Sequence, residues 1–267
     1  MIVIVCIKQV PGVSEVRIDP ETNTLVREGI PSIINPMDKN GIELGVSIRE
    51  KYGGKIIGIS MGPPQAEEAL REALAMGLDE AYLLTDRAFA GADTLATSHT
   101  LSLGIKKILK ENKENTNFLI ICGTQAIDGD TAQVGPALAE ELELPQVTYV
   151  QDFQLKEDRI LVERAFRFEE VVEISAPIPA LISVLKELNT PRYPTMRKIV
   201  QAYEKPIYYL NHKDIHAKKE KIGLTGSQTE VWKIFVPKRK GEHIILEGNT
   251  NEMVSTLLDN LKEDKVL

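Results

Sequence analysis

Short apolar segments rich in β-branched residues recur along the first half of the chain, and segments that favour helix lie between them. They occupy residues 2–7, 55–60, 80–85 and 117–122. Strands that are apolar on both faces are typical of a parallel sheet that helices cover on both sides. The pattern therefore predicts an α/β fold with a doubly wound, mostly parallel sheet.

Proline, glycine and short polar residues mark the ends of the intervening helices. We expect helices over about 36–52, 65–76 and 94–109. Asn35 and Asp93 stand where a capping residue is expected, and glycine follows the first two helices. Proline in the first turn and glycine after the last one are the usual signals of helix ends. These helices would connect the predicted strands.

Two features modify this regular pattern. A β-hairpin insertion is predicted at residues 15–26, inside the first connection between a strand and a helix. After Pro145, extended segments near 148–155, 159–164 and 169–174 predict antiparallel strands added to the sheet.

The C-terminal part of the chain has a lower apolar density and is rich in lysine. We predict one main domain over residues 1–210 and a C-terminal arm over residues 211–267. The arm contains Trp232, the only tryptophan, and an amphipathic helix that includes Met253 and Leu257 should follow it. Because the arm carries apolar anchors, we expect it to pack on a partner subunit.

Composition excludes several classes of protein. With 32 basic and 39 acidic residues the net charge is -7, so no positive field attracts nucleic acid or an anionic membrane. Cys6 and Cys122 are the only cysteines, each in an apolar run, and we predict free buried thiols in a reducing compartment. No apolar stretch approaches about 20 residues and no targeting segment is recognisable, so we expect a soluble cytoplasmic protein.

The sequence contains no motif of a self-sufficient enzyme. Its four histidines form no HExxH pair, so we expect no metal site. There is no Gly-x-Ser-x-Gly elbow, and neither cysteine has an evident activating histidine. A GxGxxG fingerprint and a Walker motif are also missing. We therefore assign no catalytic residue.

The most informative loop begins at Gly123, directly after a predicted strand. Gly123 and Gly129 allow close approach of the backbone, while Thr131 and Gln133 supply polar groups near the next helix. Ligands of α/β sheets bind where such loops leave the carboxyl ends of the strands. From spacing alone, a tight turn and a nucleotide loop fit this segment equally well.

Three other connections, at residues 6–10, 61–63 and 91–97, should end at the same edge of the sheet. Thr94 and Thr97, one helical turn apart, could donate two hydroxyls to a pyrophosphate or merely cap the helix. Lys8 could neutralise a phosphate or remain solvated.

Two acidic residues in the Gly123 loop oppose a simple phosphate-binding interpretation. Asp128 and Asp130 would repel a phosphate if they pointed at it. We assign them to capping, to backbone contacts or to hydrogen bonds with ribose hydroxyls, or else only to shaping the turn.

Five short stretches stand in the same order as in a known family. They are Ile7-Lys8-Gln9-Val10-Pro11, Asn35-Pro36-Met37-Asp38, Ser60-Met61-Gly62-Pro63 with Ala73-Leu74-Ala75-Met76-Gly77, Gln125-Ala126-Ile127-Asp128-Gly129-Asp130, and Leu188-Asn189-Thr190-Pro191-Arg192-Tyr193. Each is unspecific alone, but the five stand in register, and the match extends over nearly the whole chain. On these stretches the chain resembles the β subunits of electron-transfer flavoproteins.

The resemblance implies a Rossmann-like domain that holds an adenine nucleotide and works with a larger α subunit. In ordinary members the nucleotide is AMP, and the redox-active FAD lies mostly in the α subunit. In electron-bifurcating members a second FAD occupies the AMP site, receives hydride from NADH, and sends one electron toward ferredoxin and the other toward the α-subunit flavin. The hydroxyl-bearing stretches at 91–97 and 128–134 make this chain similar to the bifurcating members.

The resemblance and the loops together imply the site residues. The expected cofactor-binding set is Cys6, Lys8, Asn35, Pro36, Met37, Asp38, Met61, Asp93, Thr94, Thr97, Gly123, Thr124, Gln125, Ala126, Ile127, Asp128, Gly129, Asp130, Thr131, Ala132, Gln133 and Val134. Met196 matches the apolar anchor that recognises a partner dehydrogenase, and Trp232 is the expected anchor of the arm. After Arg164 the chain has Ala165-Phe166, where ordinary members have an acidic residue and then a glycine pair. The local contact with the α-subunit flavin is therefore left open.

The resulting hypothesis is a β subunit that carries FAD and has no activity without its α subunit. Its expected partners are that α subunit, an acyl-CoA dehydrogenase or reductase-like enzyme, and ferredoxin, with NADH as a transient substrate. One alternative is the ordinary β subunit with AMP in the same site. A second is a stand-alone regulatory protein that binds ATP or AMP without flavin, although the Trp232 arm favours a partner.

Overall fold

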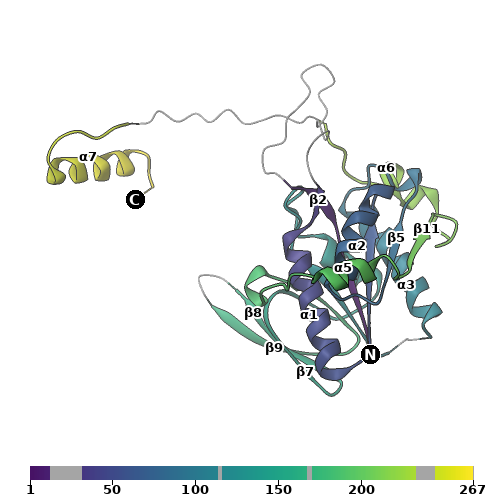
Figure 1. Cartoon of the computed structure of the whole chain (residues 1–267). Coiled ribbons are helices and arrows are strands. Elements are labelled where there is room, and N and C mark those ends of the chain that lie inside the picture. Colours follow the sequence, from purple (N-terminus) through teal and green to yellow (C-terminus); the bar gives the residue numbers. More distant parts are fainter. Residues whose placement is uncertain (13–31, 114–115, 167–169, 233–243, 267) are drawn as a thin grey trace. The chain divides into compact units, whose positions relative to one another are not determined.

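The computed structural model divides into two compact units, Met1–Trp232 and Lys233–Leu267 (Figure 1). The described residues are 1–12, 32–113, 116–166, 170–232 and 244–266. The hairpin predicted at residues 15–26 lies outside them. The domain boundary expected after residue 210, and the packing of the arm on a partner, stay predictions.

A large sheet forms the centre of the first unit (Figure 1). Its strands are β1 (Ile2–Cys6), β4 (Lys55–Met61), β5 (Glu80–Leu84), β6 (Phe118–Gly123), β7 (Gln146–Lys156), β8 (Arg159–Ala165), β9 (Val171–Pro177), β10 (Ala180–Val184) and β11 (Ile207–Leu210). Among the described residues the strand order is β11-β5-β4-β1-β6-β10-β7-β8-β9. All neighbours from β11 to β7 are parallel, and β8 and β9 are antiparallel to their neighbours. The predicted α/β fold with a mostly parallel sheet and added antiparallel strands is confirmed.

The side chains of β1 alternate between two hydrophobic cores, one on each face of the sheet. The helices that supply these cores are α1 (Pro36–Tyr52), α2 (Glu67–Met76), α3 (Thr94–Glu111) and α4 (Val134–Glu141). Val3 and Val5 share a core with residues of α1 and α2, whereas Ile2 and Ile4 share one with residues of α3 and α4. Every residue of β1 is buried, as expected for the centre of a doubly wound sheet.

Most helix ends follow the signals in the sequence, although the side chain of Asn35, the residue before α1, makes no capping hydrogen bond. Pro36 occupies the first turn of α1, and Gly53, with φ of 73°, ends that helix. Gly77 ends α2 with φ of 146°, a conformation that favours glycine. The carboxylate of Asp93 accepts a hydrogen bond from the backbone N–H of Ala96 at 3.0 Å and caps α3. The three predicted helices are confirmed, with α3 two residues longer than expected.

Several short elements complete the first unit. They are β2 (Gln9–Pro11), β3 (Ser32–Ile34), α5 (Met196–Ala202), α6 (Gly223–Gly226) and the 3₁₀ helices at Pro64–Ala66, Arg87–Phe89, Lys186–Leu188 and Lys219–Lys221. Strands β2 and β3 form a separate antiparallel pair. Strand β11 was not predicted; it adds to the edge of the large sheet by parallel pairing with β5.

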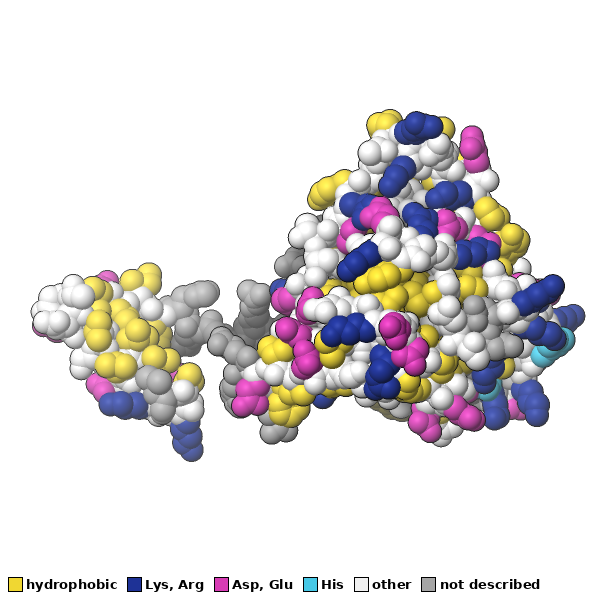
Figure 2. Space-filling model, turned by 90° about the horizontal axis from the view of Figure 1, so that it is seen from below, with side chains coloured by type: hydrophobic (Ala, Val, Ile, Leu, Met, Phe, Trp, Pro, Cys, Tyr) yellow, Lys and Arg dark blue, Asp and Glu magenta, His cyan; other side chains and the backbone are white. Residues whose placement is uncertain are grey.

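The described part of the second unit contains helix α7 (Thr250–Glu263). Asn249 and Glu252 form a capping box at its start. Val254, Leu257 and Leu258 are exposed, and Figure 2 shows hydrophobic side chains gathered on one side of this unit. The predicted amphipathic helix is confirmed. In the described residues, no helix combines the length and the apolar character that crossing a bilayer requires.

Candidate functional site

The carboxyl ends of three neighbouring strands form the edge where a ligand is expected. Strand β1 pairs with β4 on one side and with β6 on the other. The helices that follow diverge, because α1 packs on one face of the sheet and α4 on the opposite face. Such a switch point is the usual ligand-binding position of an α/β sheet. Cys6, Met61 and Gly123 end these strands, and we call the surface around them the nucleotide edge.

The buried side chain of Asn35 joins three segments at the nucleotide edge. Its Nδ2 donates to Oδ1 of Asp38 at 3.0 Å and to the carbonyl oxygen of Gln125 at 2.9 Å. Its Oδ1 accepts from the backbone N–H of Ile127 at 3.2 Å, and its own N–H donates to the carbonyl of Lys8 at 2.9 Å. Asn35 therefore fixes the loop after β6 against the start of α1.

Asp38 lies behind the loop and is also buried. Its Oδ2 accepts from the backbone N–H of Lys8 at 2.7 Å. Burial raises the pKa of Asp38 to about 7, although hydrogen bonds from Asn35, Lys8 and Gly123 oppose the shift. A Cβ at Gly123 would lie 2.2 Å from Oδ1 of Asp38, so glycine is required there. At neutral pH the carboxyl of Asp38 is protonated for a large fraction of the time, which reduces negative charge at this edge.

The outer part of the loop exposes polar groups that pair with one another. Lys8 Nζ donates to Oδ1 of Asp128 at 2.7 Å, in an exposed ion pair of small energetic value. Gln125 Nε2 donates to the carboxylate of Asp130. Both acidic residues thus have hydrogen-bond partners within the chain. Lys8, the residue expected to neutralise a phosphate, forms an ion pair with Asp128.

The end of this loop meets the start of α3. Thr94 Oγ1 donates to Oε1 of Gln133 at 3.2 Å. Asp130 and Ala132 have φ of 52° and 53°, a left-handed backbone that turns the loop sharply toward α4. Thr97 lies one turn further along α3 and is partly buried. Two candidate loops that are far apart in the sequence therefore border one surface.

Asp93 has a role that the sequence did not suggest. Its Oδ2 accepts from the backbone N–H of Gln228 at 2.8 Å and from the backbone N–H and hydroxyl of Thr229 at 3.0 and 3.1 Å. Partial burial works against ionisation, but the hydrogen bonds from Ala96, Thr229 and Gln228 hold the pKa of Asp93 below its usual value. The carboxylate connects the start of α3 to the chain just before Trp232.

The two cysteines are free and buried, as predicted. The neighbouring Cys6 thiol and burial raise the pKa of Cys122 well above its usual value. A buried thiol with a raised pKa, such as that of Cys122, behaves as a small apolar group rather than as a nucleophile. No group of three or more metal-ligating side chains was found in the part of the chain that the structure describes.

The two expected docking residues are both exposed on the first unit. Met196 is the first residue of α5 and is 76% exposed, and Trp232 is 97% exposed. Sequence reasoning did not include Tyr193, Val200 and Tyr203, which are exposed around Met196. Their spacing of three to four residues could have revealed them.

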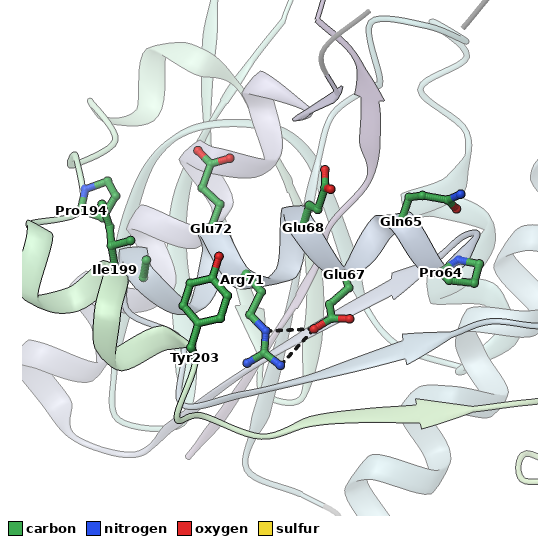
Figure 3. Close-up of a pocket in the computed structure, with 10 residues that line it drawn as sticks. Pro64, Gln65, Glu67, Glu68, Arg71, Glu72, Pro194, Ile199 and Tyr203 are labelled. Atoms are coloured by element: carbon green, nitrogen blue, oxygen red, sulfur yellow. Dashed lines mark hydrogen bonds and ion pairs between the residues drawn. The ribbon is translucent and has the colours of Figure 1, made fainter. Parts of the chain in front are cut away.

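A groove of about 470 Å³ lies between α2 and α5, not at the predicted nucleotide edge. Pro64, Glu68 and Glu72 line it from the side of α2, and Pro194 and Tyr203 from the side of α5 (Figure 3). None of these belongs to the predicted cofactor-binding set. We assign the groove to the neighbourhood of Met196, since α5 forms one of its walls.

Comparisons with known proteins identify the family of this chain. The family model described as electron transfer flavoprotein domain matches residues 22–215. An electron transfer flavoprotein subunit beta of Thermoanaerobacterium thermosaccharolyticum is 51% identical over 269 residues, covering 100% of both chains. The caffeyl-CoA reductase-Etf complex subunit CarD of Acetobacterium woodii is 48% identical, also with 100% of both chains covered.

A third relative is the acryloyl-CoA reductase electron transfer subunit gamma of Anaerotignum propionicum. It is 39% identical over 273 residues, with 100% of both chains covered. The matched family model spans most of the described sheet. It includes the ends of β4 and β6 at the nucleotide edge, but not the end of β1. With full-length relatives at this level of identity, the chain belongs to the electron transfer flavoprotein family, as one of its β subunits.

Proposed function

We propose that this chain is the FAD-carrying β subunit of an electron-bifurcating electron-transfer flavoprotein. With its α subunit it takes electrons from NADH and delivers them to ferredoxin and to an acyl-CoA dehydrogenase or reductase-like enzyme in the cytoplasm. The observation that carries the proposal is the contact between Thr94 and Gln133, which joins the first turn of α3 to the loop after β6. Both stretches of polar donors thereby border one strand-end surface.

The residues of the nucleotide edge have the chemistry that an adenine dinucleotide requires. The first turn of α3, an 18-residue helix, offers backbone N–H groups and the hydroxyl of Thr97 to an anion. The hydroxyl of Thr94 becomes a second donor to the ligand when it releases Gln133. At Gly129 no atom lies within 4 Å of an added Cβ, so the loop is open to a ligand there. AMP has one phosphate and FAD has a pyrophosphate, so the second set of hydroxyl donors favours FAD.

When bound, FAD supplies the hydride and electron chemistry. The residues of this chain bind and orient it. Asn35 and Asp38 hold the loop from behind through buried hydrogen bonds. The partial protonation of Asp38 lowers the repulsion of a phosphate.

Two surfaces support the proposed partners. The names of two relatives refer to a caffeyl-CoA reductase-Etf complex and to an acryloyl-CoA reductase. The exposed side chain of Met196 is flexible and apolar, which suits docking to such an enzyme. Trp232, almost fully exposed in the chain alone, suits burial against the α subunit.

Extraction of nucleotides from the purified αβ heterodimer tests the proposal. We expect two FAD per heterodimer and no AMP. One FAD with one AMP would instead identify an ordinary electron carrier. A colourless, well-folded solitary chain that binds ATP or AMP would indicate a stand-alone regulator.

A further inference from the structure

Residues 189–203, which we call the docking segment, expose a stripe of large apolar side chains. Tyr193, Met196, Val200 and Tyr203 are 95%, 76%, 63% and 72% exposed. From Met196 onward they lie four and seven residues apart, on one face of α5. In α5 itself, only Ala202 is buried. Apolar burial therefore contributes little to the conformation of this segment.

Arg192 attaches the docking segment to α1 through two carboxylates. Its Nε and Nη2 donate to the two oxygens of Glu43, each at 2.8 Å, and its backbone N–H donates to Glu43 Oε2 at 3.0 Å. Its Nη1 and Nη2 donate to Glu50 at 2.6 and 3.0 Å. The Glu43 side chain is only 11% exposed, so water screens this pair less than it screens a surface ion pair. Bidentate contacts of this kind fix orientation as well as distance.

A second attachment lies next to the first. Asn40 Nδ2 donates to the carbonyl oxygen of Asn189 at 2.8 Å, and Asn189 Nδ2 donates to the carbonyl oxygen of Asn40 at 3.0 Å. Asn40 is buried. Asn40 and Glu43 are one turn apart on α1, so this helix holds the start of the docking segment at consecutive turns.

The end of the docking segment is held by α2. Arg71 Nη1 donates to the carbonyl oxygens of Ala202 and Lys205 at 3.0 and 2.9 Å, where α5 ends. Its guanidinium also pairs with Glu67 and lies 5.7 Å from the ring centre of Tyr203 (Figure 3). Polar contacts thus fix both ends of a segment whose apolar side chains face outward.

We propose that Arg192 is a positioning residue for partner docking: by holding the docking segment on α1 through Glu43 and Glu50, it presents the Met196 stripe in one fixed conformation. This inference rests on the proposed docking role of Met196. A segment ordered before the encounter loses less conformational entropy on binding. Lysine cannot replace arginine in this role, because an ammonium group lacks the planar fork that meets two carboxylates.

The test compares wild-type and Arg192→Lys heterodimers by hydrogen exchange and by steady-state electron transfer to a purified acyl-CoA dehydrogenase. We expect amides of residues 193–203 to exchange about tenfold faster, as for a segment that opens locally more often. We expect KM for the dehydrogenase to rise by a similar factor, with kcat and flavin content unchanged. Arg87→Lys, an exposed arginine outside the docking segment, is the matched control and should change neither value.

Two further heterodimers, Glu43→Gln and the double variant Glu43→Gln with Arg192→Lys, test whether Arg192 acts through its contact with Glu43. If Arg192 acts through Glu43, the double variant should resemble the worse single variant in KM, because interacting residues are not additive. Additive effects would overturn the inference, and so would unchanged exchange of residues 193–203 in Arg192→Lys. A wild-type heterodimer that fails to reduce the dehydrogenase would instead contradict the proposed function, and the exchange rates would still decide whether Arg192 holds the segment.

Discussion

The nucleotide edge and the docking segment are both held by α1, yet they expose opposite kinds of side chain. At the nucleotide edge, buried Asn35 and Asp38 support a loop whose outer surface is polar. At the docking segment, Arg192 and Asn189 turn inward to α1, while apolar side chains such as Met196 turn outward. A polar rim suits a small charged ligand, and an apolar stripe suits a protein surface.

The two regions also differ in how a surface loop is held in place. Behind the nucleotide edge the polar groups are almost fully buried, so each unpaired atom would be costly. Behind the docking segment the ion pairs remain partly exposed, and their contribution is smaller. Substitutions at the nucleotide edge should therefore change stability more than substitutions at the docking segment.

The largest effect is expected from the titration of Asp38. Its pKa in the folded protein is about 7, against an ordinary value of 3.8. Because the folded state prefers the protonated form, the stability that Asp38 contributes is fully present below about pH 4 and is lost as the pH rises toward and through 7. The loss attributable to this group is on the order of 4 kcal/mol.

Urea unfolding of wild type and Asp38→Asn between pH 4 and pH 8 measures this contribution. The free energy of unfolding of wild type should fall relative to that of Asp38→Asn as the pH rises. Asp152→Asn, at an exposed position of β7, controls for the loss of one carboxylate. A difference that stays constant over the range would show that burial of Asp38 is not costly.

A smaller loss is expected from adding one methyl group behind the loop. In Gly123→Ala the new Cβ would meet Asp38 Oδ1 at 2.2 Å, and the loop would have to move. We expect a loss of about 3 kcal/mol in the free energy of unfolding, together with weaker nucleotide retention. Gly129→Ala is the matched control, since nothing lies within 4 Å, and should cost less than about 0.5 kcal/mol. Equal losses for both variants would contradict the packing described for Asp38.

Local signals in the sequence were sufficient for most of the fold. The strand Ile2–Cys6 and the end of α2 at Gly77 could both be predicted, because each depends on residues that are close in the sequence. Strand β11 could not be predicted in the same way. Tyr208 and Tyr209 are exposed, and the strand exists through pairing with β5, more than 120 residues earlier in the chain.

The candidate sites show the same division. The loop from Gly123 could be singled out because glycine, aspartate and threonine gather directly after a strand, although from spacing alone a tight turn fits them equally well. The attachment of Arg192 to Glu43 joins residues with a sequence separation of 149, and nothing near either residue indicates it. The hydrogen bonds that residues 228–229 donate to Asp93 were not predicted, for the same reason.

The most direct test of the nucleotide edge is the flavin content of a heterodimer carrying Thr94→Val and Thr97→Val together. Each hydrogen bond to a charged group contributes about 1.5–3 kcal/mol, so retention of the second FAD should weaken by at least about tenfold while the α-subunit FAD remains. Thr100→Val, one turn further along α3, removes only an internal hydrogen bond to Ala96 and should leave both flavins in place. Two tightly held FAD in the double variant would contradict the account.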